Sequence, residues 1–231
     1  MAPMSEVFGP PASWYQRLWR KFRHWWHGPD NFAEPTNPEL VREAVAWFSA
    51  FLDEALSLPI PAKQQYLEEA TLLFTRMTPM ALRRVREHVQ QIDFYPSLED
   101  LTVAVGQHHA PVRTRAQQGR TIGGAYDSAT GQMWLDGLDP DKEDDTVLSH
   151  YAHEFGHALD GPERQITSHA LWKQAWREEI CPQRMTLAAL ASPKEGLAEF
   201  ARLLYTGIAL RIDLERHYPL CVEVWKGFGL W

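Results

Sequence analysis

Cysteine is scarce in this sequence, whose 231 residues include only Cys181 and Cys221. Two cysteines cannot form the dense disulfide framework of small secreted domains, so we expect two reduced thiols. Long apolar runs are missing as well, since no stretch approaches the ~20 apolar residues of a transmembrane helix. The N-terminus has no short basic segment followed by an unbroken apolar run, which argues against a signal peptide. These absences predict a cytoplasmic protein.

Positive charge is also in short supply, because 23 Lys and Arg stand against 30 Asp and Glu and give a formal net charge of −7. General nucleic-acid binders usually have a basic surplus, so we expect no nucleic-acid partner. Hydrophobic residues make up 45% of the chain, which is enough for one sizeable core.

Changes in pattern divide the chain into three parts. Residues 1–30 contain an amphipathic, basic helix over residues 13–27, with aromatic side chains on one side and basic side chains on the other. Two hypotheses fit this helix: its aromatic face docks on the protein's own core, or it makes peripheral contact with a membrane or a partner protein. Residues 31–97 are predicted to be helical and packed against the third part, residues 98–231.

Caps and prolines mark the helices of the second part. Asn37 and Pro38 predict a helix start, and Pro59 and Pro61 predict its end. Two further helices are predicted at about residues 62–77 and 78–91.

The third part mixes both kinds of element. The β-branched segment LTVAV, residues 101–105, predicts a strand, and residues 121–135 predict a hairpin with a turn at residues 128–131. Helices at about residues 166–180 and 193–206 and a short aromatic tail follow the hairpin. The expected class is therefore α+β, mainly helical, with a small antiparallel or mixed sheet.

The segment LSHYAHEFGHALDGPE, residues 148–163, gathers three histidines and three carboxylates. His153 and His157 form an HExxH motif, and residues four apart on a helix lie one above the other, so both imidazoles can reach one cation. Glu154 lies close to the same face, where it can take a proton from water bound to the metal. Apolar side chains occupy the opposite face of the predicted helix, which indicates packing against a core.

Catalytic zinc usually takes three protein ligands, so a third is needed from elsewhere. The downstream candidates are Asp160, Glu163, His169, Glu178, Glu179, Glu195 and Glu199. Asp160 is better suited to orienting a histidine than to ligation.

Two of these candidates share the segment ASPKEGLAEFARLLY. Ser192 and Pro193 predict a helix start, and Glu195 and Glu199 stand one turn apart on one face. Ser192-x-x-Glu195 also matches a capping box, in which Glu195 would fold back to the helix start. With two histidines needing a carboxylate, ligation by Glu195 is the favoured interpretation. Glu199 then supports the site, or becomes the ligand if Glu195 caps.

HEFGHALD, followed about forty residues later by SPKEGLAEF, resembles the zinc metallopeptidases related to anthrax lethal factor and to Mlc titration factor A, which are gluzincins. The resemblance covers roughly residues 98–206. It implies a zincin-like catalytic domain and one Zn²⁺ per chain, held by His153, His157 and Glu195, with Glu199 as a supporting carboxylate. It further implies an endopeptidase or aminopeptidase that acts on a peptide or protein substrate.

One position departs from those families, which have a tyrosine seven residues before the ligand glutamate to help stabilise the tetrahedral intermediate. This sequence has Ala188 there. The candidates for a replacement donor are Tyr126, His169, Arg184 and Tyr205.

These residues predict zinc-dependent peptide hydrolysis, in which Glu154 takes a proton from zinc-bound water and delivers it to the leaving amine. The strand at residues 133–135 is expected to form the rim of the cleft, where an extended peptide adds to its edge. Ala188 and the helix at residues 13–27 favour an alternative hypothesis: a regulatory protein-binding module that retains a zinc site with weak or no catalysis.

Overall fold

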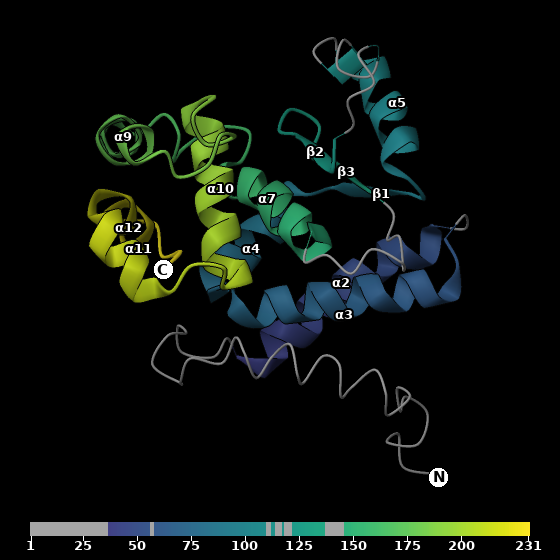
Figure 1. Ribbon diagram of the computed structural model, residues 1–231. Helices are drawn as coiled ribbons and strands as arrows, with labels where there is room; N and C mark the ends of the chain where they lie inside the picture. The colour runs from purple at the N-terminus through teal and green to yellow at the C-terminus, as the bar shows by residue number, and fades with distance from the viewer. Residues whose placement is uncertain (1–36, 56–57, 110–111, 114–116, 118–121, 137–145) are drawn as a thin grey trace. The chain divides into compact units, whose positions relative to one another are not determined.

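The computed structural model describes residues 37–231 except 56–57, 110–111, 114–116, 118–121 and 137–145, and leaves the side chains of residues 146–149 undescribed. The described residues belong to one compact unit, residues 33–231. The predicted helix at residues 13–27 lies outside the described residues. The α+β prediction is confirmed in the described part, where helices predominate over one small mixed sheet (Figure 1).

Three helices follow one another after residue 37, as predicted: α2 (Pro38–Glu54), α3 (Ile60–Arg76) and α4 (Pro79–His88). Local capping explains two of the starts. The Asn37 side chain accepts a hydrogen bond from the backbone N–H of Glu39, and Thr78 accepts one from Ala81. Figure 1 shows α2 and α3 side by side, and both pack into the main core.

The strand prediction for LTVAV is wrong, because this segment lies within helix α5 (Leu98–His108). Ser97 accepts a hydrogen bond from the N–H of Asp100 and begins the helix. Leu101 and Val105, four residues apart, then form its buried face. Capping and helical burial therefore outweigh the β preference of valine and threonine, which depends strongly on context.

The first strand, β1 (Gln91–Tyr95), lies within residues 31–97, which were predicted to be all-helical. The α4 helix ends at His88, and the next residues alternate, so that Ile92 and Phe94 are buried. A five-residue strand directly after a helix gives only this short alternating pattern. In the sequence, such a short pattern cannot be told apart from a continuation of the preceding helical periodicity.

The sheet has the order β1-β3-β2 in the described residues, with β2 (Gly124–Asp127) and β3 (Gln132–Asp136) forming the predicted hairpin. β3 pairs with β1 in parallel and with β2 antiparallel. β3 is therefore central, and the prediction that residues 133–135 offer a free edge is wrong. The other strand of the hairpin, β2, lies at one edge of the sheet.

Alternation along β3 divides the apolar side chains between two clusters. Met133 and Leu135 belong to the main core, whereas Trp134 packs with Leu101 and Val105 of α5 in a smaller cluster. Val105, Ile122 and Ala125 of the smaller cluster also line the cavity described below.

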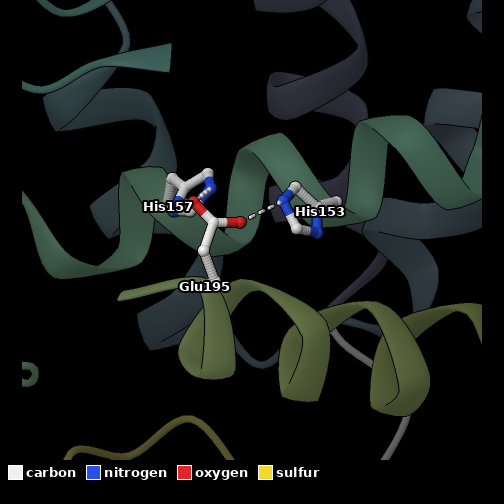
Figure 2. Close-up of side chains that lie close together, drawn as sticks. All are labelled: His153, His157 and Glu195. Atoms are coloured by element: carbon white, nitrogen blue, oxygen red, sulfur yellow. Dashed lines mark ion pairs between the residues drawn. The ribbon is translucent and has the colours of Figure 1, made fainter. Parts of the chain in front are cut away.

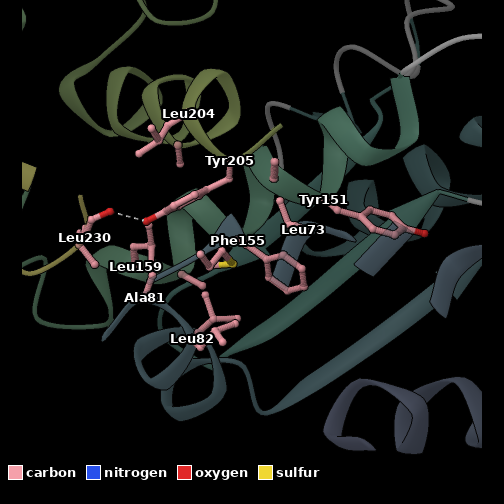
Figure 3. Packing of buried hydrophobic residues seen from close by; sticks show 14 of the residues in the cluster. Leu73, Ala81, Leu82, Tyr151, Phe155, Leu159, Leu204, Tyr205 and Leu230 are labelled. Atoms are coloured by element: carbon pink, nitrogen blue, oxygen red, sulfur yellow. Dashed lines mark hydrogen bonds between the residues drawn. The ribbon is translucent and has the colours of Figure 1, made fainter. Parts of the chain in front are cut away.

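Helix α7 (Thr146–Asp160) directs Tyr151, Phe155 and Leu159 into the main core (Figure 3). Helix α10 (Pro193–Thr206) begins at the residue that the serine and proline predicted, and ends at Gly207 with φ +75. The two helices pack directly against each other. Each buries one face in the core, which leaves their polar side chains to meet at the site.

Short helices complete the C-terminal region. The predicted helix at 166–180 begins later, at α8 (Ala170–Ala175), and continues through a π-helical turn η3 (Trp176–Ile180) into α9 (Cys181–Gln183). The prediction of an aromatic tail is wrong, because that segment forms α11 (Arg211–His217) and α12 (Pro219–Gly227). The α12 helix starts where the buried carboxylate of Glu179 accepts two backbone N–H groups.

Both cysteine thiols are free, as predicted. Among the described helices, none combines the length and the apolar character needed to cross a membrane.

Candidate metal centre

Helix α7 presents the two motif histidines side by side. The rings of His153 and His157 have centroids 4.8 Å apart and stand nearly perpendicular, at 89°. His157 is buried, at 6% exposure, and His153 is half-buried. Because Phe155 and Leu159 of the same helix lie in the core, the helix cannot rotate both imidazoles away from the site without unpacking that core.

Helix α10 brings Glu195 to both imidazoles (Figure 2). Its Oε2 lies 3.3 Å from Nε2 of His153, and its Oε1 lies 3.6 Å from Nε2 of His157. Ser192 caps α10 by accepting from the N–H of Glu195, so the serine half of the predicted capping box forms while the carboxylate points to the histidines.

The three side chains could hold a metal ion. One ligand atom from each of His153, His157 and Glu195 lies within 4.8 Å of the others. In a regular tetrahedron with metal–ligand bonds of about 2.0–2.1 Å, neighbouring ligand atoms lie about 3.3 Å apart. The distance from Oε2 of Glu195 to His153, 3.3 Å, and the distance from Oε1 of Glu195 to His157, 3.6 Å, are each close to that value. Two imidazoles and one carboxylate are also a common protein ligand set of catalytic zinc.

Glu199, one turn after Glu195, contacts the outer nitrogen of His153. Its Oε1 lies 2.8 Å from Nδ1 of that imidazole, and Arg202 donates to both carboxylate oxygens, at 3.0 and 2.9 Å. Burial alone would raise the pKa of Glu199, but the hydrogen bonds from His153 and Arg202 lower it to about 2. An ionised Glu199 accepts the Nδ1 proton of His153 and leaves Nε2 available for a metal.

Protonation of the metal-free site follows from burial and charge. Burial alone would lower the pKa of His153, but hydrogen bonds to Glu195 and Glu199 raise it to about 10. Burial lowers the pKa of His157 to about 3, so this imidazole is neutral, and its Nδ1 has no hydrogen-bond partner among the described residues. Without a metal, His153 therefore carries a proton between the two carboxylates, and a metal that bound there would displace that proton.

Glu154 lies beside the candidate ligand His153 and against the edge strand β2. A Cβ added at Gly124 of β2 would lie 2.6 Å from Cγ and 2.9 Å from Oε1 of Glu154, so the strand passes directly over this side chain. Burial raises the pKa of Glu154 from 4.5 to about 7. A buried carboxyl with such a pKa is suited to exchange a proton near neutral pH.

A cavity of about 600 Å³ opens over these groups. Its described lining includes the edge segment Gly123–Ala125, the apolar side chains of Val105, Val112 and Ile122, and the polar groups of His109, Tyr126, His150, His153, Glu154, His157, Lys194, Glu195, Glu199 and Arg202. Ala188 also lines the cavity, so the position at which the resembled families have a tyrosine does face this space.

The four candidate donors for a tetrahedral intermediate do not gather at this site. Tyr126 lines the cavity, but its hydroxyl donates to the carbonyl of His88 at 3.0 Å. Tyr205 is buried in the core and donates to the carbonyl of Leu230. His169 caps α8, and Arg184 ends α9 in the left-handed conformation. Neither His169 nor Arg184 is among the described residues that line the cavity.

Asp160 has a different neighbourhood from the one predicted. Its Oδ1 accepts the N–H groups of Ile166 and Thr167, at 2.8 and 2.9 Å, and its Oδ2 accepts the Thr167 hydroxyl. These bonds organise the turn that follows α7, and no interaction with His153 or His157 occurs among the described contacts of Asp160. The other candidate ligands, Glu163, Glu178 and Glu179, bond elsewhere.

Sequence reasoning assigned no role at this site to Gly124, to Lys194 or to the pair His150–Asp136. The Nδ1 of His150 lies 3.4 Å from Oδ1 of the buried Asp136. His150 stands four residues before Glu154 in the segment LSHYAHEFGHALDGPE, and this spacing was the available signal.

Comparison of the chain with protein-family models, with curated proteins and with solved structures found no match.

Proposed function

We propose that this protein is a zinc-dependent metallopeptidase of the gluzincin kind, in which His153, His157 and Glu195 hold one Zn²⁺ per chain. The observation that supports this most directly is the convergence of the three side chains from two helices, with separations of 3.3 and 3.6 Å between the paired atoms. Bound zinc would lower the pKa of water and polarise the scissile carbonyl.

Glu154 is the general base in this proposal. It takes a proton from the attacking water and returns it to the leaving amine. Its burial in the cavity wall supports this role, because a buried carboxyl is shielded from solvent water while it holds the proton between the two steps. Glu199 keeps His153 in one orientation through the bond to Nδ1.

The substrate in this proposal is an extended peptide that pairs with the edge strand β2. Gly123, Gly124 and Ala125 line the cavity, and a glycine at 124 allows a close approach between the strand and Glu154. Backbone hydrogen bonds to β2 would hold the peptide, while the side chains along the cavity determine which residues fit.

The experiment compares the parent protein with Glu154→Gln. Metal analysis of the purified chain is expected to give one zinc per chain for both proteins. Digestion of a peptide library is expected to show zinc-dependent cleavage by the parent and a loss of at least ~10²-fold in Glu154→Gln. A parent without stoichiometric metal, or equal cleavage by the two proteins, would contradict the proposal. Zinc binding without cleavage, together with tight capture of one protein, would instead support the regulatory binding module.

A further inference from the structure

Peptide hydrolysis places negative charge on the former carbonyl oxygen, and a preorganised donor at that oxygen is worth about 10²–10³-fold in kcat. Ala188 cannot supply a donor, although it lines the cavity. Another group in the cavity must therefore donate to this oxygen, if the protein has the proposed peptidase function.

Two of the donors that line the cavity already have partners. Tyr126 donates to the carbonyl of His88, and Arg202 is bonded to both oxygens of Glu199. Moving either group to a substrate would break bonds that the fold uses, and for Arg202 it would also release the carboxylate that orients His153.

Two histidines, His109 and His150, also line the cavity, and neither comes from α10. His109 follows α5 and packs its ring edge-on against Trp134, with centroids 6.0 Å apart. His150 stands one turn before Glu154 on α7, close to Asp136 and directly beneath Gly123, where an added Cβ would lie 2.3 Å from the ring. His150 therefore lies on the side of the general base and of the edge strand.

Lys194 reaches the cavity from α10, the helix that supplies Glu195. It directly precedes that ligand in the first turn of the helix, and it is half-buried. Within the part of the chain that the structure describes, no hydrogen bond or ion pair of its ammonium group is found. An ammonium group has three donors on a flexible stem, so it can follow a charge that develops in front of it.

Lys194 lines the same cavity as Glu154, His157 and Glu195, so an oxygen bound among these groups lies in the space that the Lys194 side chain borders.

We propose that Lys194 donates a hydrogen bond to the carbonyl oxygen of the scissile peptide bond as that oxygen becomes negative, in place of the tyrosine that Ala188 replaces. The ammonium group enters from α10, whereas Glu154 enters from α7, so the base and the donor act on different atoms of the substrate.

The test uses the full chain loaded with zinc and compares Lys194→Met, Lys194→Arg and a surface control, Lys173→Met, whose side chain is exposed on α8. Two assays are used besides the measurement of zinc affinity. The first measures kcat and KM on a fluorogenic peptide that the parent cleaves. The second measures the binding constant of a phosphinic peptide, whose tetrahedral anion imitates the charged intermediate.

Lys194→Met is expected to lower kcat by about 10²–10³-fold with KM nearly unchanged, and to weaken phosphinic peptide binding by a comparable factor. Lys194→Arg is expected to recover part of both losses, and Lys173→Met to match the parent. Zinc affinity should stay within about threefold in every variant, since Lys194 is not a ligand.

Four results for Lys194→Met would overturn the inference. Three of them are a kcat within about threefold of the parent, an effect on KM alone, and unchanged binding of the phosphinic peptide. The fourth is a loss of zinc, which would mean that the charge of Lys194 stabilises Glu195. Normal cleavage by the parent and by Lys194→Met together would refute the role of Lys194 and leave the peptidase function standing. A parent that cleaves no peptide would overturn both.

Discussion

Gly156 of α7 and Ala198 of α10 are in backbone contact, because a Cβ at position 156 would lie 2.7 Å from Cα of Ala198. This contact is the point at which the helix of the two histidines meets the helix of Glu195. A larger residue at 156 would push the helices apart by moving backbone, and the separations of 3.3 and 3.6 Å at the metal position depend on that spacing.

Gly156→Ala is therefore expected to destabilise the protein by about 1–3 kcal/mol, although alanine is the better helix former. It should also weaken zinc binding, because Glu195 moves with α10. Urea denaturation and competition with a chelator measure the two effects. Gly227→Ala is the control, since an added Cβ there meets nothing within 4 Å, and it should leave stability unchanged or raise it by up to about 1 kcal/mol. Equal behaviour of the two variants would contradict this account.

The sequence predicted the parts of this site that depend on local chemistry. The four-residue spacing of His153 and His157 and the cap at Ser192 each involve residues within one or two helical turns, and the structure has both elements where they were predicted. The approach of Glu195 to the histidines was argued from what a metal needs, not from anything that positions α10 in the sequence. Gly156 is what permits it, and a glycine in a helix does not reveal its neighbour.

The two wrong strand predictions arose because they rested on local sequence patterns alone. LTVAV has the residue types of a strand, but a serine cap and the burial of Leu101 make it a helix. Residues 133–135 were expected at an edge because a hairpin has two strands, and the sequence offered no sign that β1 would pair with β3 from the other side. Pairings between distant segments are decided by packing, which local propensity cannot report.

Glu199 holds Nδ1 of His153 at 2.8 Å while Arg202 holds Glu199. Glu199→Gln removes the negative charge that makes His153 a stronger ligand and weakens the pair with Arg202. Zinc affinity is expected to fall by about 10–100-fold, measured by competition with a chromophoric chelator. Glu178→Gln removes an exposed carboxylate from η3 and should not change the affinity. An affinity of Glu199→Gln within threefold of the parent would show that the contact does not tune the metal.

Asp160→Asn separates a structural role from a supporting role at the metal. The carboxylate of Asp160 accepts hydrogen bonds from Ile166 and Thr167, and an amide cannot accept at both of its ends. The free energy of unfolding is expected to fall by about 1–3 kcal/mol in urea, with zinc affinity unchanged. The opposite pattern, weaker zinc binding at unchanged stability, would restore the role that was predicted for Asp160.

The buried carboxyl of Glu154 should make the metal-free protein less stable as pH rises. Burial raises its pKa in the folded state to about 7, whereas the unfolded chain titrates near 4.5. Below pH 4.5 Glu154 is protonated in both the folded and the unfolded chain, and its contribution to stability is complete. Between pH 4.5 and about 7 the unfolded chain ionises at this group while the folded chain stays protonated, so this contribution is lost as pH rises.

Glu154→Gln cannot ionise, so it should be more stable than the parent by about 1–3 kcal/mol at pH 8 and by much less at pH 4. Urea denaturation of both metal-free proteins across this range measures the difference. Zinc-loaded samples are a necessary comparison, because a cation beside Glu154 favours its ionised form and should shrink the gap at pH 8. A difference that does not change with pH would mean that the side chain is not held in its buried position.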